Sequence, residues 1–538
     1  MTRRPSVRVV VHDPVVPRWA AQLVESLVAD WSADVVVPER TPGTDPGRTN
    51  PAITAYRRAD ARVFGRSDDP TVPVRLGRRG AAAGSGVQPS AGRPRGGADV
   101  TIELGIRPTD AALPQPNNVV WQLRQASLSP AVDPSVASSD ADVADVLTRT
   151  VVAITELVDI RPDGMATALR RIVSSSDPLS ARRGGRDHFP KVTAMVLNAL
   201  RDMAIDGRLH PAPPLSVPDD RGAGRWPQST PRAALAIGRV AIGYVARRVG
   251  RLGSRERWFV AIHDEAPAAT GKAIVADPHA TAFRLLQPPS GREWADPFLV
   301  AGPNGPVLFA EEWVRSRGRA RIVVLDRPGD GSGATARPVL DLDQHVSYPF
   351  VFEWQNDWYL LPQRDGESLE LYRAARFPDS WRWDRTLLAE RAADATLVEH
   401  DGRWWLFTAR PGPGGRTADE LHVYIAASPL GPWRAHPRNP VVSDVRTARP
   451  GGAFFRHAGR LYRPAQDGGP TYGYALVVMR VDRLDEDGYA ETCVQRIEPT
   501  WRPRMIATHT LNSLGELTVI DAAIREPRRP LPRRGART

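Results

Sequence analysis

A hairpin pattern recurs five times in the second half of this 538-residue chain. Each copy joins a run of aromatic and β-branched residues through a small turn to a second such run, as two antiparallel strands do. The turns lie at Asn304-Gly305, Asn356-Asp357, Asp401-Gly402, Ala458-Gly459 and Leu514-Gly515. A spacing of about fifty residues is the length of one four-stranded blade, so the pattern predicts an all-β five-bladed β-propeller over residues 255–524. A β-sandwich, the alternative fold, would not explain a fixed period.

The first part of the chain follows a different pattern. Residues 7–11 form a β-branched run, residues 19–29 have helical periodicity, and residues 33–37 form a second apolar run. A strand, a helix and a strand in this order are typical of a parallel sheet. We therefore predict an α/β domain of the Rossmann kind over residues 1–205.

Three further segments differ from both domains in composition. Residues 58–97 are rich in Arg, Gly, Pro, Ala and Ser and have few apolar side chains to bury, so we predict a disordered insertion. Residues 206–254 are predicted to hold a linker and an amphipathic helix. Residues 525–538 are predicted to be a basic tail, for which a weak peripheral contact with anionic lipid stays open.

The composition argues against several classes of partner. Although the formal net charge is +11, the basic residues are scattered among Asp and Glu without a basic stripe, so we predict no nucleic-acid binding. The single cysteine, Cys493, excludes an internal disulfide and a thiolate metal cluster. The first residues lack the apolar run of a secretory signal, and no run of about eighteen apolar residues occurs. We expect a cytoplasmic protein with no transmembrane segment, no metal and no cofactor.

The residues just ahead of each hairpin are the first candidates for a functional site. The innermost strands of a propeller converge on its axis, so these residues would line one funnel. They provide an ionisable group in each blade: Asp296, His345, Asp394, Arg449 and His509. Burying such groups is costly unless they pair or meet a ligand, so the pattern favours a binding funnel.

Each of these groups also has a structural interpretation. Asp296 could cap a turn, Asp394 and Arg449 could form a buried ion pair, and the two histidines could be core residues with satisfied hydrogen bonds. Neighbouring candidates for substrate contacts are Trp294, Glu312, Ser347, Tyr348, Arg463, Gln466 and Tyr472. Trp294 would stack on a sugar ring if it were exposed. Glu312 is preferred over Glu311, and Arg449 with Arg463 would hold an anionic group such as a phosphate.

Several runs together resemble one family. They are WADPF, HVSYPFVFE, SLELYRAARFP, SPLGPWRAHPRNPVV, ARPGG and LYRPAQD followed by TYG. These runs resemble the N-terminal domain of plant glucosamine inositolphosphorylceramide transferases and of bacterial proteins from surface-polysaccharide loci. That domain is similar in architecture to the five-bladed propellers of glycoside hydrolase family 43. The resemblance spans about residues 257–522 and places the site in the funnel.

The resemblance also implies roles for individual residues. Family 43 hydrolases use a base, a second carboxylate that tunes pKa and a Glu general acid; Asp296 matches the first and Asp394 the second. Arg449 lies where the acid would be sought, with Asp467 or Glu312 as substitutes. In bacterial relatives a formyltransferase-like domain precedes the propeller, and residues 155–185 resemble that arrangement. Residues 117–133 contain no His for such a site, so we predict a degenerate formyltransferase-like domain.

The sequence thus predicts a carbohydrate-active protein of cell-envelope polysaccharide metabolism. It would act on or bind a sugar, a nucleotide-sugar or a glycolipid head group, with Asp296, Asp394 and Asp467 as catalytic candidates. One alternative is a glycan-binding or scaffold module without turnover. The other is formyl or acyl transfer to an amino sugar by the N-terminal domain.

Overall fold

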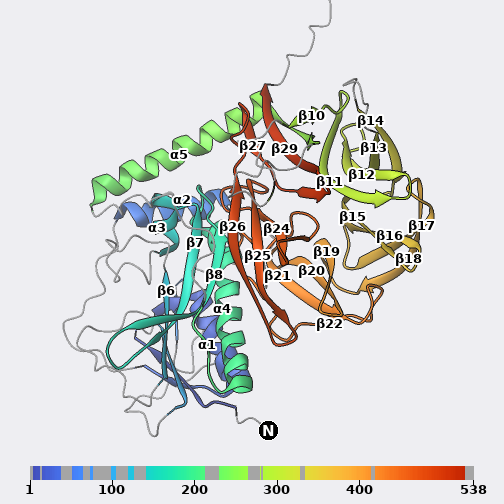
Figure 1. Cartoon of the computed structure of the whole chain (residues 1–538). Helices are drawn as coiled ribbons and strands as arrows, with labels where there is room; N and C mark the ends of the chain where they lie inside the picture. Colours follow the sequence, from blue (N-terminus) through green and yellow to red (C-terminus); the bar gives the residue numbers. More distant parts are fainter. Residues whose placement is uncertain are drawn as a thin grey trace, which may run out of the picture. The chain divides into compact units, whose positions relative to one another are not determined.

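The chain forms two compact units in the computed structural model (Figure 1). The first contains Met1–Tyr244, and the second contains Val245–Arg410 and Ala418–Thr538. The structure describes residues 4–12, 15–37, 51–64, 73–76, 98–104, 119–125, 141–148, 150–212, 229–264, 275, 279, 283–326, 334–412 and 418–527. None of the helices in these ranges combines the length and the apolar character that crossing a membrane requires.

The first unit is built on a six-stranded mixed sheet. Its strands, in spatial order, are β3 (Asp34–Val36), β1 (Val7–Val11), β5 (Val100–Leu104), β6 (Val119–Gln125), β7 (Val152–Ile160) and β8 (Ala166–Ser175). The first four are parallel and the last two antiparallel. In β1 the alternate residues Val7, Val9 and Val11 are buried, as expected for a β-branched strand with one face on the core. The predicted α/β class is therefore confirmed.

Helices cover this sheet. Trp19 of α1 (Arg18–Trp31) stacks on Phe189 of α4 (Ala181–Asp206), with ring centroids 5.0 Å apart. The remaining elements are α2 (Pro51–Phe64), α3 (Ala141–Thr148) and the small ribbon of β2 (Val15–Pro17) with β4 (Pro73–Arg75). A further helix, α5 (Thr230–Gly253), contains much of the segment predicted to be amphipathic.

The predicted disordered insertion begins too early. Helix α2 continues to Phe64, because Ile53 and Tyr56 bury apolar surface against Val143 and Val146 of α3 and so offset the cost of ordering the segment. Strand β4 also falls within the predicted insertion. The rest of residues 58–97 lies outside the described residues.

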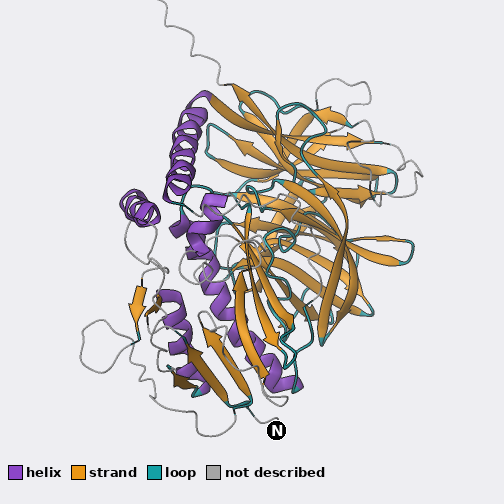
Figure 2. Cartoon of the chain, turned by 90° about the vertical axis from the view of Figure 1, so that its left-hand side faces the viewer, coloured by secondary structure: helices purple, strands orange, loops and turns teal. Residues whose placement is uncertain are grey.

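The second unit is almost entirely β-structure (Figure 2) and consists of five sheets. The first three blades run outward through β11 to β14, β15 to β18 and β19 to β22, and the fourth runs through β23 to β26. Their bounds are β11 (Arg292–Gly302), β12 (Gly305–Val314), β13 (Arg319–Asp326), β14 (Thr335–Leu340), β15 (Val346–Trp354), β16 (Asp357–Arg364), β17 (Leu369–Arg376), β18 (Ser380–Leu388), β19 (Ala393–His400), β20 (Arg403–Pro411), β21 (Ala418–Ala426), β22 (Arg434–Ala435), β23 (Phe455–His457), β24 (Arg460–Asp467), β25 (Ala475–Asp485) and β26 (Gly488–Ile497). The predicted five-bladed propeller is confirmed.

The fifth blade joins the two ends of the propeller. Its strands are β9 (Ser254–His263), β10 (Arg284–Leu286), β27 (Met505–Ala507), β28 (Leu511–Leu514) and β29 (Leu517–Pro527). Strand β29 pairs antiparallel with β9 from Thr518↔His263 to Pro527↔Ser254. The ring is therefore closed by backbone hydrogen bonds between the first and last strands of the unit. Because β29 extends to Pro527, the predicted tail cannot begin at residue 525, and its remainder lies outside the described residues.

Candidate functional site

Three inner strands carry the same backbone irregularity. The pairing register shifts between Ala295 and Phe298 in β11, between Ser347 and Phe350 in β15, and between Ala393 and Thr396 in β19. Within these bulges Asp296, Tyr348 and Asp394 have φ angles of 47°, 48° and 53°. Residues other than Gly rarely adopt this left-handed conformation, and when they do the strain is often found at functional sites. Bulges also re-aim side chains, and here they bring one from each blade to the propeller axis.

In blade four the residue with a positive φ angle is a glycine. Gly452 has a φ of 140°, and a Cβ at this position would lie 2.0 Å from the carbonyl oxygen of Leu511. The backbone N–H of Gly452 donates to Tyr348 Oη at 2.9 Å, and that hydroxyl lies 2.9 Å from Thr396 Oγ1. Only glycine allows the chain to approach so closely, and the approach places Arg449, which precedes it, over the axis.

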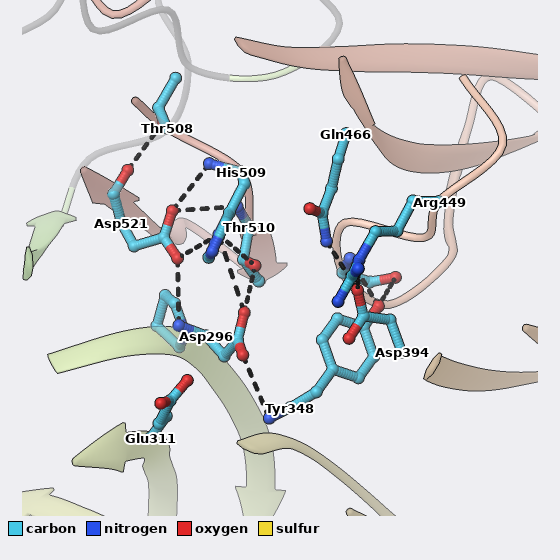
Figure 3. A network of polar contacts seen from close by, with 12 residues as sticks. Asp296, Glu311, Tyr348, Asp394, Arg449, Gln466, Thr508, His509, Thr510 and Asp521 are labelled. Carbon is cyan, nitrogen blue, oxygen red and sulfur yellow. Dashed lines mark hydrogen bonds and ion pairs between the residues drawn. The ribbon is translucent and has the colours of Figure 1, made fainter. Parts of the chain in front are cut away.

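The side chains that meet there define the axial cluster: Asp296, Glu311, Tyr348, Asp394, Arg449, Gln466, His509 and Asp521 (Figure 3). They come from all five blades, and most are buried. At one end Tyr472 is 60% exposed, and the guanidinium carbon of Arg449 lies 5.0 Å from the centre of its ring. The side chain of Arg449 is itself 17% exposed, so solvent reaches this end of the cluster.

One half of the axial cluster surrounds Asp296. Its carboxylate accepts hydrogen bonds from Thr510 Oγ1 at 2.7 Å and from the Tyr348 N–H at 3.1 Å. His509 Nδ1 lies 3.7 Å from Asp296 and 2.7 Å from Asp521, whose carboxylate also accepts the N–H of Asp296. Glu311 of β12 lies beside Asp296 in Figure 3.

Three ionisable groups in this half have shifted pKa values. Burial raises the pKa of Asp296 to about 6, and it raises the pKa of Glu311 well above its ordinary value, with the Asp296 charge adding to the effect. Burial by itself would lower the pKa of His509, but Asp521 and Asp296 outweigh it and raise that pKa to about 9. Two carboxyl groups with raised pKa values and a histidine with a raised pKa therefore lie side by side, an arrangement that suits acid–base chemistry.

The other half is an ion pair. Arg449 Nε donates to Asp394 at 2.5 Å, and Gln466 Nε2 donates to the same carboxylate at 2.8 Å. Gln466 Nε2 also donates to the carbonyl of Pro450, which fixes the amide orientation. Among the residues that the structure describes, Gln466 Oε1 has no hydrogen-bond partner although it is buried. Such an acceptor is costly to leave unpaired.

Several sequence candidates lie elsewhere. Trp294 is fully buried and donates to Glu312 at 3.3 Å, so it is not exposed for stacking on a sugar. Glu312 pairs with Arg321 at 2.8 Å on the face of β12 opposite to Glu311. Glu311 therefore lies in the axial cluster and Glu312 outside it, since successive residues of a strand point to opposite faces.

Two candidates in blade four also lie outside the axial cluster. Arg463 is fully buried and pairs with Glu491 at 2.7 Å, and Asp467 pairs with Arg496 at 2.7 Å. Both lie on one face of β24, whereas Gln466 lies on the other and reaches the axial cluster. Arg463 and Asp467 therefore do not join the axial cluster, and Arg463 cannot hold an anionic group there together with Arg449.

Blade two also departs from the prediction. Tyr348, not His345, occupies the position equivalent to Asp296 and Asp394. His345 lies farther out, with Nε2 3.9 Å from Glu311 and Nδ1 accepting the N–H of Ala320. Ser347 is buried beside the bulge. Glu311 ranks below Glu312 on the sequence alone, and Thr510 and Asp521 are not among the sequence candidates. The alternation of β12 separates Glu311 from Glu312, but Asp521 gives no signal within its apolar strand.

A metal could be held by part of this arrangement. One ligand atom each from Asp296, His509 and Asp521 lie within 4.8 Å of one another, and carboxylate with imidazole suits several divalent cations. These same atoms already bond to each other and to Thr510. The expectation of a site without metal stays untested.

The first unit contains a different kind of histidine. His188 is buried, its Nε2 lies 2.7 Å from Thr155 Oγ1, and burial lowers its pKa to about 3. It therefore stays neutral at ordinary pH. The formyltransferase-like character of this unit remains a prediction.

Comparison with known proteins confirms the resemblance of the propeller. Residues 274–502 match the family model described as glucosamine inositolphosphorylceramide transferase 1, N-terminal. The chain is 36% identical over 205 residues to glucosamine inositolphosphorylceramide transferase 1 of Oryza sativa subsp. japonica, covering 37% of this chain and 28% of that protein. For the Arabidopsis thaliana protein of the same name the identity is 37% over 208 residues, covering 37% and 26%. The chain thus spans less than a third of the length of these relatives.

Solved glycoside hydrolases were also found. The family 117 glycoside hydrolase Zg3597 from Zobellia galactanivorans is 11% identical, with a TM-score of 0.32 over 50% of this chain and 91% of that one. A GH43_1 enzyme from Xanthomonas citri is 13% identical, with a TM-score of 0.32 over 44% and 87%.

Proposed function

We propose that the axial cluster binds a carbohydrate, and that it prefers a neutral or an amino sugar to an anionic one. The observation that supports this most is Gln466 Oε1, a buried acceptor that lies in the cluster and lacks a partner among the described residues. A sugar hydroxyl would donate to it. Carboxylates beside it offer further acceptors, and the exposed ring of Tyr472 offers a face on which a sugar can stack.

Charge decides the class of sugar. The axial cluster contains four carboxyl groups, Asp296, Glu311, Asp394 and Asp521, against the cations Arg449 and His509. Both cations are already paired with carboxylates. An added phosphate or uronate would meet an excess of negative charge, whereas an ammonium group would be attracted. The word glucosamine in the name of the matching relatives agrees with this preference.

A binding screen tests the proposal. Thermal unfolding of the full chain is followed with glucose, glucosamine, N-acetylglucosamine, glucuronate and nucleotide-sugars, in wild type and in Asp296→Asn. A matched control is Asp467→Asn, which changes a buried Asp paired with Arg496 outside the axial cluster. We expect neutral or amino sugars to raise the midpoint in wild type and in Asp467→Asn but not in Asp296→Asn. No shift with any sugar, or a shift with glucuronate alone, would contradict the proposal.

A second candidate function is catalysis by Asp296 and Glu311. It is favoured by the adjacent carboxyl groups, one with a pKa of about 6 and one with a pKa well above its ordinary value. The Asp394 carboxylate is instead held in a hydrogen-bonded ion pair with Arg449. Release of sugar from glycosides, followed against pH, should show an ionisation near pH 6 that disappears in Asp296→Asn. Binding without any turnover would leave the non-catalytic glycan-binding module as the function.

The setting that we propose is cell-envelope polysaccharide metabolism in the cytoplasm, with a glycolipid head group or a nucleotide-sugar as ligand. The sugar ring of either ligand would lie in the axial cluster and its phosphate outside it. The matching relatives, whose name contains inositolphosphorylceramide, support a glycolipid head group. Formyl or acyl transfer by the first unit would instead require a folate or acyl donor to stabilise residues 1–205, which the same screen can detect.

A further inference from the structure

Helix α5 has an apolar face that is already covered. Ala236, Ile237 and Val240 contact a cluster that contains Ile53 of α2 and Val146 of α3. Ala233, four residues before Ile237, is fully buried. This is the ordinary arrangement of an amphipathic helix, with one stripe on the core of its own unit.

The opposite face of α5 is apolar as well. Leu235, Ile242 and Val245 are 59%, 70% and 59% exposed, and their spacing of seven and three residues puts them on one side of the helix. Gly238 and Ala246, which are also exposed, lie between or beside them. Large apolar side chains gathered in this way mark a surface that meets another apolar medium.

The charges of α5 identify that medium. The helix contains five Arg residues and no Asp or Glu. Arg232 and Arg239 are exposed and flank the apolar stripe on one side, and within the described part of the chain neither forms an ion pair. A helix with an exposed apolar stripe beside unpaired Arg is suited to lie in the interface of an anionic membrane, since its apolar side chains enter the acyl region and Arg meets phosphate.

We propose that the face of α5 formed by Leu235, Ile242 and Val245, with Arg232 and Arg239, binds the surface of an anionic lipid bilayer. The helix lies on the bilayer and does not cross it. The proposal is independent of the sugar site. It is separate from the lipid contact left open for the predicted basic tail.

Flotation with lipid vesicles tests the proposal on the full chain. The vesicles contain phosphatidylcholine alone or phosphatidylcholine with phosphatidylglycerol. We expect wild type to float with the anionic vesicles and not with the neutral ones, and salt to weaken the binding. A variant with Leu235→Glu and Ile242→Glu should lower the bound fraction at least tenfold. Met165→Glu, which changes an equally exposed apolar residue in the turn between β7 and β8, should bind as wild type.

A second variant distinguishes a loss of lipid binding from a failure to fold. Arg232→Gln with Arg239→Gln leaves the apolar stripe intact and should remove the preference for anionic vesicles, with an unchanged unfolding midpoint. The proposal is overturned if wild type does not float, or if the Glu variant binds as well as wild type. It is also overturned if size exclusion shows a dimer that the Glu variant dissociates while vesicles are not bound, because the face would then serve a second copy of the chain.

Discussion

The propeller contains two buried polar networks that differ in their balance of charge. The blade-four network consists of Arg463, Glu491, Tyr489 and the carbonyl of Thr447. Its single cation and single carboxylate balance, and Arg463 donates to both oxygens of Glu491. The axial cluster has four carboxyl groups for two cations. Each network leaves one buried atom without a partner among the described residues, Arg463 Nη1 in blade four and Gln466 Oε1 in the axial cluster. The networks therefore differ in charge: the blade-four network is balanced, whereas the axial cluster holds an excess of carboxyl groups that a ligand would use.

The largest effect is expected in the blade-four network. Glu491→Gln would leave the fully buried Arg463 without its counter-charge, so we expect the free energy of unfolding to fall by about 3–5 kcal/mol. Urea unfolding measures this, with Glu516→Gln, an exposed turn residue, as the control. A loss below about 1 kcal/mol would mean that this network is not the closed, fold-supporting one.

A smaller loss is expected in the ion-paired half of the axial cluster. Asp394→Asn removes the charge next to Arg449 but keeps an acceptor, and Arg449 is partly exposed to water. We expect about 1–3 kcal/mol of destabilisation together with loss of sugar binding. Chemical unfolding and the binding screen should be run on the same preparation. Unaltered sugar affinity would exclude Asp394 from the site.

His509 should make stability depend on pH. Its pKa is raised from 6.5 to about 9 in the folded protein, so its stabilising effect is complete below pH 6.5 and is lost as the pH rises through 9. We expect the free energy of unfolding to fall by about 2–3 kcal/mol between pH 6.5 and 9.5. In His509→Gln this decline should be smaller. An identical decline in both proteins would assign it to other groups.

The smallest effect is expected at Glu311. Because burial raises the pKa of Glu311 well above its ordinary value, the neutral form of its carboxyl is favoured, and an amide can replace that form with similar shape. Glu311→Gln should therefore change the free energy of unfolding by less than about 1 kcal/mol. A loss as large as that of Glu491→Gln would show that Glu311 is a paired, structural carboxylate.

The fold could be predicted because its signals are local. A hairpin every fifty or so residues specifies the blade, and a β-branched run followed by an amphipathic helix specifies the first unit. The start of the predicted insertion was harder to place. Helix α2 is ordered by contacts with α3, far away in sequence, and composition does not reveal such contacts.

The site could be predicted only in part, because some of its residues give a local signal and others do not. Asp296 and Asp394 precede inner strands, and any propeller brings those positions together. Glu311 and Glu312 are neighbours on one strand, and so are Gln466 and Asp467. Which member of each pair faces the axis depends on the alternation of side chains between the two faces of the strand. A single bulge, such as the one between Ala295 and Phe298, changes which residues share a face, and the sequence does not show it.

The most direct test of the difference between the two networks is a calorimetric titration of the sugar that gives the largest thermal shift. It compares wild type with two double variants, Asp296→Asn with Glu311→Gln and Arg463→Met with Glu491→Met. The second pair removes the blade-four network as a whole and so avoids an unpaired buried charge. We predict that the first variant loses binding at least tenfold and that the second binds as wild type. Equal affinity in wild type and in the Asp296 and Glu311 variant would contradict the assignment of the axial cluster as the carbohydrate site.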